Sequence, residues 1–277
     1  MLPSAKPGKA ETTMPLTPNT TKQRLQAGKI ALGFGVHHLR TVAAPVLAAA
    51  TGHDWMFIDT EHGAFSIQET TQLCIAALPT GVTPIVRVCA GALDEATRAL
   101  DNGALGIVVP HVDTAADAKR IADAFHYPPM GHRSWGGPPA VYGYQPPATE
   151  EAQAAINAGI LTIVMLESPE AIRNAAEIAS IDGIDVLFIG TSDLTAELRI
   201  SGQMGHPLVI DAYQEVGDAC RRHGKVLGMG GVYDEENASR YVAMGARFLL
   251  TGSDHSYIVS GAAQRSAFFN RLPGTPA

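Results

Sequence analysis

Three shortages in this sequence narrow its class before any motif is considered. Only 17% of the 277 residues are charged, whereas 46% are hydrophobic, so the chain can bury a sizeable core and is unlike a disordered protein. No apolar run approaches the roughly 18 residues that a membrane helix needs, and the first residues contain no apolar signal-peptide segment. We therefore expect a globular chain with no membrane partner.

Cysteine and basic residues are also scarce. Cys74, Cys89 and Cys220 lie far apart, which argues against a disulfide framework and predicts a cytoplasmic location. The formal net charge of −7 argues against a nucleic-acid partner, which would need a basic surface. The chain has 14 arginines but only 6 lysines, and this imbalance bears on mechanism below.

Short apolar or β-branched segments alternate along the chain with longer Ala-rich amphipathic segments. Eight such strand–helix units predict a parallel (β/α)₈ TIM barrel. An open doubly wound sheet is the alternative, but no GxGxxG motif follows an early strand. Residues 1–20 are predicted to form a flexible extension, and residues 21–277 a single barrel domain. The predicted strands are Ala31–Val36, Trp55–Glu61, Pro84–Val88, Gly106–Val112, Leu161–Ser168, Val186–Asp193, Val226–Gly231 and Phe248–Asp254.

Ionisable side chains gather at the carboxyl ends of these otherwise apolar strands. Those ends meet at one mouth of a barrel, where barrel enzymes have their active sites. A single Asp or Ser at such a place is usually a helix cap, but His, Arg, Glu and Asp together indicate one shared site. The ionisable residues are Asp59, Glu61, His62, Arg87, His111, Glu167, Asp193 and Asp254, and the polar Ser192 lies beside Asp193.

Glu167 and Asp193 end neighbouring strands, because one strand–helix unit separates them. Two carboxylates with no Cys or His between them suit a hard divalent cation, Mg²⁺ or Mn²⁺ with Co²⁺ as a further option. The alternative is that both residues only cap the helices that follow.

Arg87 lies in an apolar segment and therefore needs an anionic or carbonyl partner. That partner is either Asp59 or Glu61 in a structural salt bridge, or the carboxylate or enolate of a substrate. His62 follows these acids at the strand end and is a candidate general base. A purely structural hydrogen-bonding role is its alternative.

At this point the motifs resemble a known family. The stretch from Asp54 to Gly63, DWMFIDTEHG, resembles the FDW-x₂-IDxEH segment of the HpcH/HpaI aldolases. The resemblance covers nearly everything from residue 22 onward. It continues through 85–88, 100–104, 106–110, 127–133, 167–171, 190–194, 205–207 and 245–248.

The resemblance implies a class II, metal-dependent aldolase that joins or splits pyruvate, or a related 2-keto acid, and an aldehyde through a metal-stabilised enolate. By analogy, Glu167 and Asp193 look like the metal ligands and His62 like the catalytic base. Arg87 looks like the residue that polarises the keto oxygen. Three further roles are implied: Asp101 supports the His across a subunit contact, amides near Ser192 and Asp193 hold the keto-acid carboxylate, and Asp59 with Glu61 supports the site.

The competing aldolase mechanism forms a Schiff base on a lysine. None of the six lysines ends a predicted strand: Lys119 lies on a helix, and Lys225 lies at the entrance of the seventh strand, on the opposite face. The sequence therefore predicts the metal-dependent route.

The segment from Tyr127 to Pro147 is rich in Pro, Gly and aromatic residues and cannot be a helix. Long loops in compact domains are usually functional, so we expect a lid that brings Arg133, together with His132, to the aldehyde. The alternative is a structural loop at a subunit contact. Two departures from the family pattern are Met165, where Gln is frequent, and the pair Thr191-Ser192, where Pro-Ala is frequent.

Three other functions stay open at this stage. The Gly-rich turns Gly228–Gly231 and Thr251–Ser253 lie where many barrels bind phosphate. An acyl-CoA lyase of the citrate lyase β type and a non-catalytic oligomeric barrel are the others. The resemblance also implies a homo-oligomer, a hexamer or trimer of dimers, in which the last helix (residues 256–272) is exchanged between neighbours. The aldehyde acceptor is not predicted.

Overall fold

Residues 13–273 are described here from a computed structural model of the chain. Eight parallel strands close into a barrel in sequence order, which confirms the predicted TIM-barrel fold and excludes the open sheet. The strands are β1 (Ala31–Val36), β2 (Trp55–Asp59), β3 (Thr83–Arg87), β4 (Gly106–Val109), β5 (Leu161–Leu166), β6 (Val186–Gly190), β7 (Val226–Gly230) and β8 (Ala246–Ser253).

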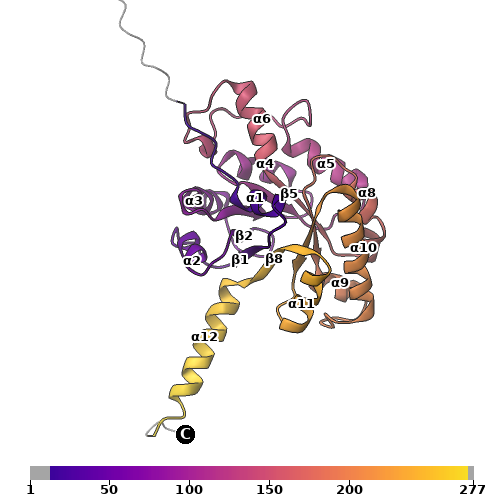
Figure 1. Cartoon of the computed structure of the whole chain (residues 1–277). Helices are drawn as coiled ribbons and strands as arrows, with labels where there is room; N and C mark the ends of the chain where they lie inside the picture. Colours follow the sequence, from indigo (N-terminus) through magenta and orange to yellow (C-terminus); the bar gives the residue numbers. More distant parts are fainter. Residues whose placement is uncertain (1–12, 274–277) are drawn as a thin grey trace, which may run out of the picture.

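Helices connect consecutive strands around this barrel, with one further helix before β1 and one after β8 (Figure 1). They are α1 (Thr20–Gln26), α2 (Ala44–Ala50), α3 (Ile67–Ala77), α4 (Leu93–Asp101), α5 (Ala115–Phe125), α6 (Thr149–Gly159), α7 (Pro169–Arg173), α8 (Ala175–Ala179), α9 (Thr191–Glu197), α10 (Pro207–His223), α11 (Glu235–Ala243) and α12 (Asp254–Phe269), with short 3₁₀ turns η1 (Leu78–Thr80) and η2 (Ala140–Tyr142).

The interior of the barrel is filled by aromatic and branched side chains. Trp55 stacks on Phe248 with ring centroids 3.9 Å apart, and the Phe188 ring meets Phe248 edge-on. Gly33 makes room for this layer, because a Cβ at that position would lie 2.3 Å from the Trp55 ring. The barrel is therefore a packed core, and chemistry is left to its rims.

Strand alternation decides which polar residues enter the mouth. Trp55 and Phe57 point into the barrel, so two residues further along β2 Asp59 points inward too. The same period places Arg87 after Ile85 on β3. It also places Glu167 after Met165, just beyond the end of β5. Three ionisable groups thus end inward-facing rows that are otherwise apolar.

Several strands end earlier than predicted, and the residues beyond them turn into loops. β2 stops at Asp59 instead of Glu61. The Asp59 carboxylate accepts the backbone N–H groups of Glu61 and His62, and these bonds fold the chain out of the sheet. Polar strand ends therefore form turns at the mouth.

Asp254 ties the start of α12 to the loop after β1. Its carboxylate is 1% exposed and accepts backbone N–H groups from His37, His38, Leu39 and His255. Burial raises its pKa, but these four hydrogen bonds outweigh burial and hold the pKa below its usual range. The stabilisation is therefore present at neutral pH and is lost as the pH falls below the ordinary range of Asp.

We expect Asp254→Ala to lower the free energy of unfolding by about 3 kcal/mol, because several backbone donors lose their acceptor. Asp254→Asn keeps one acceptor oxygen and should lose less. Urea denaturation at neutral pH measures both variants. Equal stability of Asp254→Ala and the wild type would contradict the structural role of this carboxylate.

The predicted N-terminal extension needs a correction in its second part. Residues 1–12 lie outside the described residues. From there to α1 the chain is not free, because the backbone N–H groups of Met14 and Thr17 donate to Gln145 and Val141. Asn19 is buried and caps α1. This stretch packs on the barrel.

The last helix, α12, projects away from the barrel (Figure 1). Its side chains after Asp254 are exposed, including Ile258 at 57%, Val259 at 65% and Phe268 at 51%. No helix among residues 13–273 combines the length and the apolar character needed to cross a membrane.

Candidate active site

Arg87 is anchored at the mouth by Asp59. Its Nε and Nη2 donate to the two oxygens of the Asp59 carboxylate, at 2.9 and 2.6 Å. The Glu61 carboxylate lies 3.1 Å from Nη1, and the guanidinium lies over the Phe57 ring. The sequence left a structural salt bridge as one alternative for Arg87. This salt bridge is present, and it involves both Asp59 and Glu61. Met165 brings its sulfur to 3.9 Å from Nη1, where the family pattern has an amide.

The pairing of Arg87 with Asp59 fixes the charge of both groups. Burial raises the pKa of the fully buried Asp59, but the hydrogen bonds and charge of Arg87 outweigh it and keep the pKa low. Burial also lowers the pKa of Arg87, and its acidic neighbours more than restore it. The mouth therefore contains a permanent cation in a fixed orientation, because a bidentate pair allows the guanidinium little freedom.

Glu167 lies deepest among the acids that the sequence assigned to a metal. Its side chain is 4% exposed. Burial raises its pKa to about 7, and the charge of Asp193 adds to this rise. Gly190, the last residue of β6, leaves the space for the carboxylate, since a Cβ there would lie 2.7 Å from Glu167 Oε1.

The donor chemistry at Glu167 and Asp193 fits a hard divalent cation. Burial and the nearby charge of Asp193 both disfavour the charged form of Glu167, and a cation between the two carboxylates would stabilise it. Within residues 13–273 no group of three or more His, Cys, Asp or Glu side chains has the arrangement of a metal site. If Glu167 and Asp193 held such a cation, water or substrate oxygens would complete its shell, as is usual for Mg²⁺.

Ser192 and Asp193 lie in the first turn of α9 at this rim, and both side chains are exposed. Gly231, with φ +82°, lies against this turn. A Cβ at position 231 would approach the Ser192 nitrogen to 3.1 Å and its Oγ to 2.7 Å. Because Gly231 has no side chain, the end of β7 leaves space beside the first turn of α9.

His62 lies at the same mouth and is accessible. Its side chain is 64% exposed, with Nε2 3.8 Å from Glu61 Oε2. The backbone N–H of His62 donates to the Asp59 carboxylate. The carboxylate that holds Arg87 therefore also fixes the backbone of His62. The His62 backbone and the Arg87 guanidinium are thus positioned by one acid.

His111 is a residue to which the sequence reasoning assigned no role. It follows β4, and its Nδ1 lies 3.2 Å from Glu167 Oε2. Its Nε2 is 3.9 Å from Glu61 Oε1, so the ring lies between two acids of the mouth. The sequence signal that could have indicated a role for His111 is its position just after β4, at a strand end.

Asp101 and Arg133 do not lie at the mouth of their own barrel. Arg133 Nη2 donates to Asp101 Oδ1 at 2.6 Å, and the guanidinium stacks on the Tyr127 ring. Asp101 ends α4, so the pair lies near the point where β4 begins, at the opposite end from the mouth. The structure therefore separates these two residues from His62, Arg87 and Glu167 of the same chain.

The predicted lid is likewise displaced from the mouth. Its η2 turn packs against the N-terminal segment through Thr17, whose N–H donates to the Val141 carbonyl. Val141, Tyr142 and Arg133 are buried. The segment predicted to be a lid that brings Arg133 to the aldehyde therefore does not cover the mouth of its own barrel; it packs on the barrel wall, where its apolar side chains are buried.

The described lysines also avoid the mouth. Two of them lie at the base of the barrel, the end opposite the mouth. Lys22 donates to the Ile160 carbonyl there, and Lys225 donates to the carbonyls of Ile181 and Ile184. Lys29 precedes β1, and Lys119 lies on α5. Between residues 13 and 273 no lysine stands at the carboxyl end of a strand, where the candidate site lies, which agrees with the metal-dependent route.

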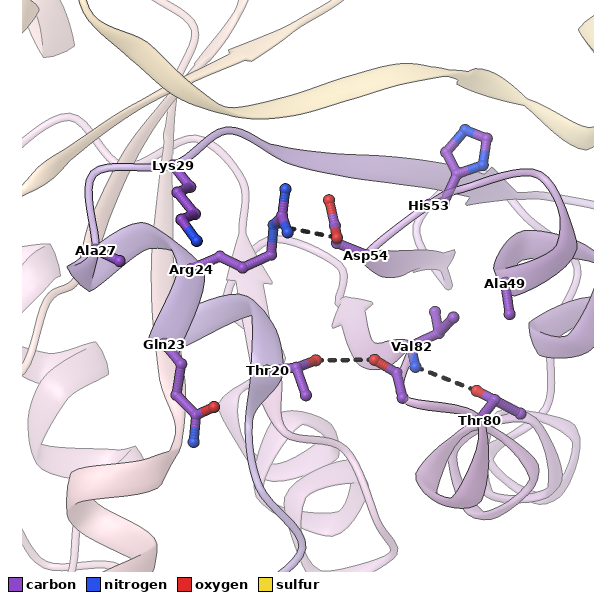
Figure 2. A pocket seen from close by; sticks show the side chains of 11 residues that line it. Thr20, Gln23, Arg24, Ala27, Lys29, Ala49, His53, Asp54, Thr80 and Val82 are labelled. Carbon is purple, nitrogen blue, oxygen red and sulfur yellow. Dashed lines mark hydrogen bonds and ion pairs between the residues drawn. The ribbon is translucent and has the colours of Figure 1, made fainter.

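Two hollows, of about 470 and 510 Å³, lie beside α1 at the base. Figure 2 shows the first, where Arg24 points toward Asp54. The Arg24 guanidinium also donates to the Ile30 carbonyl, so its charge is already engaged. Neither hollow contains a residue of the candidate active site, and the chemistry lies at the other end.

Comparison with known proteins agrees with this geometry. The family model for HpcH/HpaI aldolase/citrate lyase matches residues 43–260. A 4-hydroxy-4-methyl-2-oxoglutarate aldolase of Hapsidospora irregularis is 32% identical over 252 residues, which cover 89% of this chain and 93% of that protein. A 2-keto-3-deoxy-L-rhamnonate aldolase of Shigella sonnei is 33% identical over 257 residues, covering 92% and 94%.

A similar solved structure is that of an HpcH/HpaI aldolase from Desulfitobacterium hafniense. It is 29% identical, with a TM-score of 0.88, and the match covers 92% of this chain and 98% of that one. The resemblance therefore extends over the whole barrel.

Proposed function

Because the chain belongs to the HpcH/HpaI aldolase/citrate lyase family and is an aldolase, a carbon–carbon lyase, we propose how its residues act on substrate. The substrates proposed are pyruvate, or a related 2-keto acid, and an aldehyde. The observation that carries this proposal is the mouth itself, where a fixed arginine, an accessible histidine and two carboxylates meet.

Glu167 and Asp193 would hold the divalent metal on which aldolases of this family depend. When bound, the metal would act as a Lewis acid that lowers the energy of the enolate. We propose Mg²⁺ or Mn²⁺, because both ligands are hard oxygen donors.

Arg87 is proposed to stabilise the negative charge that develops on the keto oxygen. Its two hydrogen bonds to Asp59 leave other N–H groups of the guanidinium available, since the group has five. A charge that is already oriented needs no reorganisation during the reaction, and this is the main source of its effect.

His62 is proposed to remove the C3 proton of pyruvate. The enolate carbon then bonds to the aldehyde carbon, and the aldehyde oxygen takes up a proton; cleavage is the reverse. The exposed ring of His62 can exchange its proton with solvent. Backbone N–H groups near Ser192 and Asp193 are proposed to hold the keto-acid carboxylate beside this ring.

The alternative functions receive less support. The citrate lyase β subunit of Mycobacterium tuberculosis shares the fold at 19% identity, whereas the aldolases are 32–33% identical. Two of the glycines proposed for phosphate have a packing reason, because a Cβ at Gly228 or Gly230 would lie 2.6 Å from Phe188. An aldolase is therefore favoured over the acyl-CoA lyase, the phosphate binder and the non-catalytic barrel.

The direct test is turnover of pyruvate with a panel of short aldehydes, with Mg²⁺ or Mn²⁺ and after treatment with a chelator. We expect product only with metal, and recovery when metal is added back. Turnover that survives complete chelation would refute the proposed metal dependence. The panel also ranks the acceptor aldehydes.

Asp101 is proposed to act at the mouth of a neighbouring copy, in a hexamer or trimer of dimers. Its side chain is 36% exposed, and buried Arg133 holds it in place. Arg133 would then contribute to substrate binding only through Asp101. The exposed apolar side chains of α12 are proposed to pack on that neighbour as an exchanged helix. We also propose a cytoplasmic location.

The oligomer is tested by Ile258→Asp with Val259→Asp. Two charges on α12 should reduce the mass measured by light scattering and, because Asp101 is then withdrawn, also reduce turnover. Tyr144→Asp, an equally exposed position outside α12, is the matched control. An unchanged mass would contradict the proposed role of α12.

A further inference from the structure

His111 adopts an unfavourable backbone conformation. Its φ is +53°, in the left-handed region that glycine occupies freely and that other residues rarely adopt. Such a conformation persists only where the surroundings enforce it, and it is found preferentially at functional sites. The contacts of the residue show what enforces it here.

Two polar groups of His111, its backbone N–H and its ring Nδ1, meet the same oxygen atom. Its backbone N–H donates to Glu167 Oε2 at 3.0 Å, and its ring Nδ1 lies 3.2 Å from the same oxygen. The other oxygen, Oε1, faces Gly190, where a Cβ would come within 2.7 Å. His111 thus contacts one oxygen of the Glu167 carboxylate, and Gly190 leaves space for the other.

The two side chains differ in their access to solvent. Glu167 is 4% exposed, whereas the His111 side chain is 54% exposed. Burial therefore does not hold the histidine in place. Glycine at this position would adopt the same backbone without strain, and the ring contact is the feature that only the histidine adds.

We infer that His111 is a positioning residue that orients the Glu167 carboxylate for the divalent cation. This inference rests on the proposed function, in which Glu167 is a ligand. A carboxylate fixed by hydrogen bonds binds a cation more tightly than one that must first be ordered, and removing such partners typically weakens metal affinity about 10–100-fold.

The test uses Mn²⁺ as the probe and measures its dissociation constant by loss of the free-ion EPR signal. His111→Gly keeps the backbone N–H, removes the ring and relieves the strain. We expect it to bind Mn²⁺ at least about 10-fold more weakly, while the metal-free protein melts no lower than the wild type. His111→Asn, which tolerates the left-handed backbone and retains a side-chain donor, should recover part of the affinity.

Tyr144→Gly is the matched control, because Tyr144 also has a positive φ, +64°, and lies in the loop away from the mouth. It should relieve strain without changing Mn²⁺ affinity. Mn²⁺ binding by His111→Gly within twofold of the wild type would overturn the inference, as would a fall in melting temperature large enough to account for the loss. Glu167→Gln separates the two proposals: if it binds Mn²⁺ like the wild type, the metal site itself is wrong.

Discussion

Replacing Arg87 with methionine is expected to slow the exchange of pyruvate C3 protons into D₂O by about 10²–10³-fold, the loss typical of one preorganised donor to a developing oxyanion. Methionine is chosen because it fills a similar volume without charge. Proton exchange observed by NMR needs no aldehyde, so it isolates enolate formation from the acceptor step. Arg87→Lys should remain impaired, because an ammonium group has no planar pair of nitrogens to match the two oxygens of Asp59 as the guanidinium does.

Arg87→Met leaves the Asp59 carboxylate buried and unpaired, so a second variant is needed as a control. Breaking such a pair typically costs about 3–5 kcal/mol of stability. The double variant Arg87→Met with Asp59→Asn removes both charges and should recover most of that stability, but not the exchange rate. Exchange restored in the double variant would mean that Arg87 only neutralises Asp59, and the proposed catalytic role would be wrong.

The second large effect is expected from Glu167→Gln. An amide oxygen is a weaker ligand than a carboxylate, so we expect metal-dependent turnover to fall by at least about 10²-fold, a scale comparable with the loss of Arg87. Added Mn²⁺ at high concentration should recover only part of the activity. Turnover within a few-fold of the wild type would exclude Glu167 as a ligand.

The same variant should change how stability depends on pH in the metal-free protein. The pKa of Glu167 is raised to about 7, so the folded state keeps a proton that the unfolded state loses above its ordinary value near 4.5. Stability should therefore fall as the pH rises from about 4.5 to 7, by up to about 3 kcal/mol. Glu167→Gln has no such proton and should flatten this part of the urea-denaturation profile.

The sequence predicted the barrel well because each strand carries its own signal. β1 has the predicted bounds, and the inward-facing rows that end in Asp59, Arg87 and Glu167 follow from simple alternation. The convergence of these residues at one mouth follows from the fold alone. Their roles in catalysis stay predictions.

Other features depend on contacts that no local pattern encodes. The ion pair between Asp101 and Arg133 joins a helix end to an irregular loop, and only the folded chain shows that the loop lies near the base. Glycine and proline content identified the loop but not the end of the barrel on which it packs. The positive φ of His111 likewise goes with its contact to Glu167, 56 residues along the chain, which no local pattern encodes.

The distribution of lysines has a practical consequence for handling this enzyme. Because the described lysines lie at the base or on the outer wall, amine-reactive coupling to a solid support through these lysines would leave the side chains at the mouth unmodified. Immobilised enzyme should therefore keep its access to substrate. Treatment with pyruvate and borohydride should leave no covalent adduct on these lysines.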